Sequence, residues 1–179
     1  MKKTGQYFEK AMEHSEVSGR FLIGFVGVIL VLFEGALAGW PVFFGAAPLL
    51  SLVFIYWMTL YHNKLMPFIT IFIMGLLSDI LFSDLIGGRA TSYMLLVLAM
   101  NLRVTDPKDD EFLKVWINFV FAVIAVMLFQ LIFFSVINFA IPSLSPMMFQ
   151  IGVTLTLFPI TYIFLFAISN LLERIKVFA

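Results

Sequence analysis

Long apolar stretches, separated by short polar or turn-forming segments, dominate this chain of 179 residues. A helix that crosses a bilayer needs roughly 20 mainly apolar residues, with a range of about 17–25. The pattern therefore predicts an all-α integral membrane protein with six transmembrane helices. The predicted spans are Phe21–Gly39, Ala46–Tyr61, Leu65–Phe82, Arg89–Leu102, Phe112–Phe139 and Met147–Leu172. The second span is short, and we expect bilayer thinning or burial among neighbouring helices to accommodate it.

The basic residues give the predicted helices an orientation, because short cytoplasmic loops of membrane proteins carry an excess of Lys and Arg. With the N-terminus in the cytoplasm, ten of the 11 basic residues fall on the cytoplasmic side, and only Arg89 lies outside. The ten are Lys2, Lys3, Lys10, Arg20, Lys64, Arg103, Lys108, Lys114, Arg174 and Lys176. We therefore expect both termini in the cytoplasm. Residues 1–20 are predicted to be a cytoplasmic or interfacial segment, and residues 21–179 a single six-helix membrane domain.

The composition excludes several classes of protein. Hydrophobic residues make up 62% of the chain and charged residues 12%, with a mean hydropathy of +1.05, so too few polar residues are present to cover a soluble domain. The net charge is zero and cysteine is absent, which argues against nucleic-acid binding and thiolate sites. Neither His14 nor His62 lies in an HExxH motif, and the chain has no P-loop or G-x-S-x-G motif. We expect no catalytic, metal-binding or cofactor-binding residues.

Charged residues stand at the turn between the third and fourth predicted spans, in the stretch GLLSDILFSDLIGGRATSY. An ionisable side chain inside a span usually faces the protein interior and meets a partner there. Asp79 lies about one turn, ~5 Å, below the end of its helix, and Arg89 opens the next helix. We predict a structural clasp in which the Arg89 side chain neutralises Asp79. Gly75 would let another helix close in, and Gly87 would form the turn, whereas Asp84 is expected to be a loop charge.

Glu34 is the other acidic residue well inside a predicted span. It falls toward the outer end of its helix, in the same region as Asp79, but a catalytic pair of acids is not favoured because Asp79 has a nearer cationic partner. We expect Glu34 to snorkel or to accept a hydrogen bond near the outer interface. In the last span, Gln150, Thr154 and Thr161 follow helical spacing on one face. They are predicted to form hydrogen bonds between helices rather than to line a substrate path.

The order of motifs in the middle of the chain resembles the rod shape-determining protein MreD family. That family shows a proline, an apolar helix ending in Tyr-Trp, a short basic or polar turn, the motif G-x-x-x-D and a glycine-containing turn followed by arginine. The matching residues are Pro48, Tyr56, Trp57, Asn63, Lys64, Gly75, Asp79, Gly87 and Arg89, and the last span matches through Pro159. One departure is Ser83, where family members often have glycine after the aspartate. The turn is therefore expected to be held differently here.

The resemblance implies a non-catalytic scaffold of the bacterial cell-elongation machinery in the cytoplasmic (inner) membrane. Family members pair with MreC, which has one membrane span and a periplasmic domain, and the pair supports MreB filaments and peptidoglycan synthases. The implied fold is similar to the six-helix substrate-binding subunits of vitamin transporters. We expect the partner at the outer end, where the loops Trp40–Ala47 and Phe139–Pro146 are apolar and uncharged. The candidate partner-binding residues are Gly35, Gly39, Trp40 and Pro142.

A function of a different class remains open, namely a substrate-binding membrane subunit of a small-molecule importer of the vitamin type. This hypothesis predicts polar and aromatic side chains that converge on an outward-facing pocket. The uncharged outer loops favour packing against a partner over the capture of a vitamin.

Overall fold

The computed structural model describes the main chain of residues 2–43, 47–102 and 111–174. Within these ranges the protein is all-α, with six α-helices and two short 3-10 helices. The α-helices are α1 (Lys2–Ala38), α2 (Leu50–Tyr61), α3 (Phe68–Leu81), α4 (Gly88–Asn101), α5 (Phe112–Asn138) and α6 (Leu144–Arg174). The 3-10 helices are η1 (Pro41–Phe43) and η2 (Asn63–Leu65). The predicted all-α class and the predicted number of six helices are thus confirmed for the described residues.

Three of the described helices are long and apolar enough to cross a membrane. Their apolar portions are Gly19–Ala38, Phe112–Asn138 and Leu144–Ala167, with 20, 27 and 24 residues. Helices α2, α3 and α4 have only 12, 14 and 14 residues. At 1.5 Å per residue they are about 18–21 Å long, shorter than the ~30 Å hydrocarbon core of a bilayer. Six complete spans therefore stay a prediction, and so does the orientation of the termini.

The start of α3 shows why a middle helix is shorter than its apolar run. Pro67 is the N-cap residue of α3, with an extended ψ of 147°. A residue that precedes proline is disfavoured in the helical conformation, and Met66 has φ −111° and ψ 82°. The apolar run Leu65–Phe82 therefore forms this helix only from Phe68 onward.

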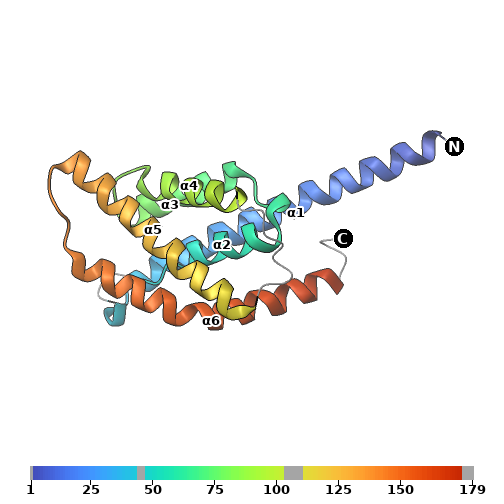
Figure 1. The fold of residues 1–179 in the computed structure, drawn as a ribbon. Helices are drawn as coiled ribbons and strands as arrows, with labels where there is room; N and C mark the ends of the chain where they lie inside the picture. Colours follow the sequence, from blue (N-terminus) through green and yellow to red (C-terminus); the bar gives the residue numbers. More distant parts are fainter. Residues whose placement is uncertain (1, 44–46, 103–110, 175–179) are drawn as a thin grey trace.

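Helix α1 is continuous over 37 residues, so the predicted N-terminal segment and the first predicted span belong to one helix. Its N-terminal part projects beyond the other helices, and the start of α1 and the end of α6 point toward the same end of the molecule (Figure 1). That placement is the one that an even number of spans requires.

Helix α2 occupies the centre of the bundle, where it packs against α1, α4 and α6 (Figure 1). Every residue from Ser51 to Thr59 is buried, so this short helix is enclosed by its neighbours. Aromatic rings connect it to the long helices: the Tyr56 and Phe119 rings form a T-shaped pair with 5.1 Å between centroids, and Phe119 stacks on Phe158 at 4.1 Å. The apolar core is centred on α2 and receives buried side chains from all six helices, and the polar site described next lies at one end of it.

Candidate functional site

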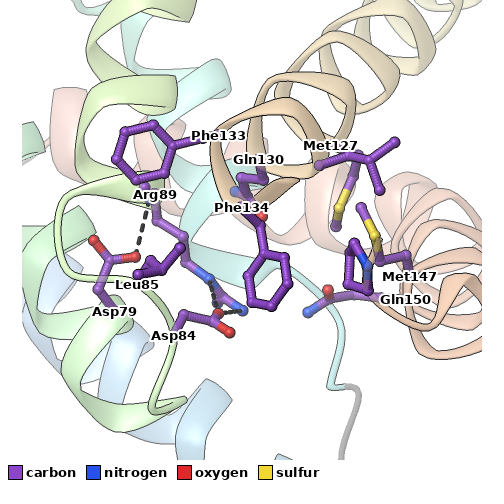
Figure 2. Close-up of a pocket in the computed structure, with 13 residues that line it drawn as sticks. Asp79, Asp84, Leu85, Arg89, Met127, Gln130, Phe133, Phe134, Met147 and Gln150 are labelled. Atoms are coloured by element: carbon purple, nitrogen blue, oxygen red, sulfur yellow. Dashed lines mark hydrogen bonds and ion pairs between the residues drawn. The ribbon is translucent and has the colours of Figure 1, made fainter. Parts of the chain in front are cut away.

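Asp79 fixes the start of α4 from the neighbouring helix α3. Its buried carboxylate accepts hydrogen bonds from the main-chain N–H groups of Gly87 at 2.7 Å and Arg89 at 2.9 Å. Figure 2 shows the second of these bonds. The first N–H groups of a helix have no partner within the helix, and a negative charge is favourable at this end. Gly87, the N-cap residue of α4, has φ 95° and no side chain with which to cap the helix. Asp79 supplies that cap across the turn.

Gly75 brings α3 and α4 close enough for this cap to form. It lies one helical turn before Asp79, against the main chain of Ala90. A Cβ atom at Gly75 would collide with the Cα atom of Ala90 and would lie 2.7 Å from its N atom. Because the obstacle is main chain, no side-chain rotation would relieve the collision. The predicted close approach at Gly75 is therefore present, and its partner is Ala90.

The Arg89 side chain turns away from Asp79. Its Nη2 lies 2.8 Å and its Nε 3.0 Å from Oδ2 of Asp84, and its Nη1 lies 3.4 Å from Oε1 of Glu34. The guanidinium also lies over the Phe82 ring, 4.2 Å from the centroid. The sequence-based prediction that this guanidinium pairs with Asp79 is therefore wrong, because the Asp79 carboxylate is taken up by the main chain of α4. Asp84 is correspondingly a partner of Arg89 rather than an isolated loop charge.

Glu34 caps the start of α2 in the same way that Asp79 caps the start of α4. Its carboxylate is fully buried, and Oε2 accepts a hydrogen bond from the main-chain N–H of Ser51, in the first turn of α2, at 3.0 Å. The other oxygen faces Arg89, so Glu34 joins α1 to both α2 and α4. The hydrogen bond expected of Glu34 is present, but complete burial contradicts the snorkelling alternative. Glu34 and Asp79 do share one region of the fold, where each is engaged as the cap of a different helix.

Further polar side chains extend these contacts across the same end of the bundle. The Ser51 and Tyr93 hydroxyl groups lie 3.1 Å apart, and Gln130 donates to the Ser92 hydroxyl at 3.4 Å. We call the whole set the outer polar layer, because it lies at the end predicted to face outward. Its members are Glu34, Ser51, Asp79, Asp84, Arg89, Ser92, Tyr93, Gln130, Gln150 and Thr154.

Helix α6 contributes two side chains to the outer polar layer, and both form hydrogen bonds with the segment that precedes α2. Gln150 donates from its side-chain amide to the Ala47 carbonyl at 2.8 Å, and Thr154 accepts from the Leu49 N–H at 3.0 Å. These two bonds join α6 to the segment before α2 and not to another helix, so the predicted role as links within the bundle holds but the predicted helix-to-helix partners do not. Thr161, predicted on the same face, instead donates to carbonyl groups of its own helix. Of the three predicted residues, Gln150 and Thr154 therefore reach another part of the chain and Thr161 does not.

A cavity of about 170 Å³ lies beside the layer, between the α3–α4 turn and the facing ends of α5 and α6. Asp84 and Arg89 line one side, and Phe134, Met147 and Gln150 lie across from them (Figure 2). Asp84 and Arg89 face each other within the wall, and Asp79, the third charged residue of the lining, is bonded to the main chain of α4. In the part of the chain that the structure describes, no group of three His, Cys, Asp or Glu side chains is placed to hold a metal ion.

The four candidate partner-binding residues fall in different environments. Gly35 is half-buried, and a Cβ atom on it would meet Leu81 of α3 at 3.4 Å, so this glycine faces another helix of the same chain. Gly39 and Trp40 are exposed just after the end of α1. Pro142 is half-buried and lines the cavity. The exposed part of the predicted surface thus lies on the loops rather than along a glycine-lined face of α1.

Sequence reasoning missed the link between Glu34 and Arg89, although the chain carries a signal for it. Glu34 and Asp79 are each an acidic residue close to the end of an apolar helix that is followed by another helix. In both cases the next helix begins without a capping side chain of its own. An acid in that position is suited to supply the missing cap.

Comparison with known proteins agrees with these observations. The family model described as "rod shape-determining protein MreD" matches residues 15–168, which include every member of the outer polar layer. No curated protein and no solved structure matches the chain. Since the matched range covers most of the 179 residues, the chain belongs to the rod shape-determining protein MreD family, whose members are generally non-catalytic membrane proteins with a role in determining rod shape.

Proposed function

We propose that this protein is a non-catalytic scaffold of bacterial cell elongation, located in the inner membrane with six spans and both termini in the cytoplasm. It holds a bitopic partner of the MreC type and, through it, acts on MreB filaments and peptidoglycan synthases. The observation that carries the proposal is the family match over residues 15–168. The apolar loops at the outer end of the bundle supply the surface for the partner.

The loop between α5 and α6 supports this assignment. Phe139 is 96% exposed and Ile141 79% exposed, next to the cavity wall at Pro142. Phe139 also has φ 50°, a left-handed conformation that costs roughly 1–2 kcal/mol for a residue with a side chain. Exposed apolar groups and strained residues each tend to mark sites of interaction. A large aromatic residue held this way is explained by contact with a partner.

The loop after α1 extends the same surface. Trp40 is 61% exposed and Val42 69% exposed, and Gly39 beside them leaves room for a close approach. Gly35 has a different part in the proposal, because it packs on α3 and holds the end of α1 in place. The partner-binding candidates therefore divide into contact residues on the loops and one residue that positions them.

The importer alternative has less support. Ligand pockets in proteins usually have volumes of roughly 300–1,000 Å³. The cavity beside the outer polar layer has a volume of about 170 Å³. Of its charged groups, Asp84 and Arg89 already form an ion pair, and Asp79 accepts hydrogen bonds from the main chain of α4. A vitamin would therefore find neither the space nor the unpaired polar groups that capture requires.

The test is co-purification of the partner with the double variant Phe139→Ala and Ile141→Ala. Truncation of interface anchors commonly costs about 1–2 kcal/mol each, so we expect roughly a tenfold or greater loss of bound partner, and rounded cells. The matched control is Ile160→Ala with Phe164→Ala, which removes side chains of similar exposure from the lipid-facing surface of α6. Equal retention of the partner by both variants would contradict the assigned surface. Rod-shaped cells after deletion of the gene, or tight binding of a vitamin-sized ligand, would contradict the scaffold itself.

A further inference from the structure

An apolar groove runs between α1 and α3 at the end of the bundle opposite the outer polar layer. Its volume is about 490 Å³. The two helices run in the same direction, since Gly19 lies against Leu65 and Gly24 against Thr70. Along the groove, Arg20 and Pro67 therefore mark one end, and Val28 and Ile73 lie about two turns deeper.

Small and polar groups keep the middle of this groove open. Gly24 has no side chain, and a Cβ atom there would lie 3.5 Å from Cγ2 of Thr70. The aromatic residues Phe21 and Phe25 stand at its rim, 77% and 64% exposed. The Thr70 hydroxyl forms no hydrogen bond with any described residue, although it lines an otherwise apolar wall.

The chemistry changes from charged to apolar along the groove. An exposed guanidinium, Arg20, stands at the end predicted to be cytoplasmic, followed about one turn deeper by the Thr70 hydroxyl and then by hydrocarbon side chains. A phospholipid has the same order, with phosphate, glycerol esters and an acyl chain. We propose that this groove binds an anionic phospholipid of the inner leaflet, with its phosphate on Arg20 and one acyl chain along Phe25, Val28 and Ile73.

The selectivity of the site resides in its charged end. Inside a bilayer an acyl chain gains little by exchanging lipid neighbours for apolar side chains, because lipid tails are as apolar as leucine. A single basic residue near the membrane surface favours anionic lipid by an amount that corresponds to roughly fivefold in occupancy. Arg20 therefore selects the headgroup, whereas Gly24 provides the space for the chain. This site is independent of the partner surface at the outer end.

The experiment measures which lipids stay with the purified full-length protein. The protein is reconstituted in vesicles of equal parts phosphatidylglycerol and phosphatidylethanolamine, re-extracted in detergent and washed, and its bound lipids are quantified by mass spectrometry. Arg20→Gln removes the charge, with Lys114→Gln as its control on an exposed basic residue of α5. Gly24→Leu fills the groove, with Gly152→Leu as its control, because a Cβ atom at Gly152 meets nothing within 4 Å.

The unaltered protein is expected to retain phosphatidylglycerol over phosphatidylethanolamine by roughly fivefold. Arg20→Gln should abolish that preference while some lipid remains bound, and Gly24→Leu should lower the retention of both lipids. The two controls should behave as the unaltered protein does. Equal retention of both lipids by the unaltered protein would overturn the proposal. Photocrosslinking from Phe25 to a copurified protein rather than to lipid would overturn it as well, because a partner helix would then fill the groove.

Discussion

Replacement of Gly75 by alanine is the smallest change that tests how α3 and α4 are joined. The added Cβ atom would lie 2.7 Å from the Ala90 N atom, whereas contacts between carbon atoms settle at about 3.5–4.0 Å. The two helices would have to separate by roughly 1 Å. Such a shift would stretch the hydrogen bond from the Arg89 N–H to Asp79, now 2.9 Å, beyond the usual range of about 2.7–3.2 Å.

The expected loss of stability combines two effects. Overpacking in a close contact costs about 1–3 kcal/mol. Loss of one of the two main-chain hydrogen bonds to the Asp79 carboxylate adds about 1.5–3 kcal/mol, because the acceptor is charged. The variant Gly75→Ala should therefore lower the free energy of unfolding by about 2.5–6 kcal/mol, a large part of the roughly 5–15 kcal/mol typical of a native protein.

The assay is unfolding of the purified protein by titration with sodium dodecyl sulfate in mixed micelles, followed by circular dichroism. Gly152→Ala is the control, because it makes the same change inside α6 in open space and should raise stability by about 0.5–1 kcal/mol. A second change, Ala90→Gly, removes only the Ala90 methyl group, so the double variant should recover little. Stability of Gly75→Ala equal to that of Gly152→Ala, or full recovery in the double variant, would refute the main-chain collision.

Three further predictions concern the turn and the topology. Asp79→Ala should destabilise the protein by roughly 3 kcal/mol or more and Asp79→Asn by less, since asparagine keeps one acceptor; equal thermal midpoints for the two variants would contradict the cap. Ser83→Gly should stabilise the protein slightly, because Ser83 has φ 51°, whereas Gly87→Ala should destabilise it by about 1–2 kcal/mol, because Gly87 has φ 95°. A higher melting temperature for Gly87→Ala than for Ser83→Gly would be inconsistent with these angles. The chain has no native cysteine, so Ser143→Cys should react with an impermeant thiol reagent in intact cells and Asn101→Cys only after permeabilisation; labelling of Asn101→Cys from outside would disprove the six-span topology.

The α3–α4 hairpin could be predicted in part because its determinants are close together in the sequence. They lie at the end of α3, in the short turn and at the start of α4, namely Gly75, Asp79, Gly87 and Arg89. Helical periodicity places the residues of α3 on the side that faces α4. The same periodicity does not say whether the carboxylate meets a side chain or the main chain. That choice depends on the φ of 95° at Gly87, which aims the first N–H groups of α4 at Asp79.

Ser83 illustrates how a departure from the family pattern can leave the geometry unchanged. Family members often have glycine at this position, and the substitution predicts a turn held differently. In the structure Ser83 adopts φ 51°, the left-handed region that glycine enters at no steric cost. The turn therefore uses the backbone conformation that glycine would favour, and serine bears the strain.

The contacts of Glu34 could not be predicted from spacing. Glu34 and Arg89 are 55 positions apart, and their pairing depends on how α1 packs beside α2 and α4. The sequence shows that Glu34 lies in an apolar span but not which partner covers it. The lengths of α2 to α4 could not be predicted either, because an apolar run does not show where the main chain leaves the helical conformation. The main chain is non-helical just before Pro67, inside one such run.

The placement of buried charge explains how the apolar outer loops can keep a defined position. A lone charge inside a membrane protein is costly, so Arg89 is held between Glu34 and Asp84. Through these contacts the end of α1 is tied to the start of α2 and to the α3–α4 turn, and Gln150 ties the start of α6 to the segment before α2. The loop that carries Trp40 therefore begins at an anchored helix end, and the loop that carries Phe139 leads into one. Truncation of Glu34 should accordingly weaken partner binding without removing a contact residue, since it would free the end of α1 from which Trp40 projects.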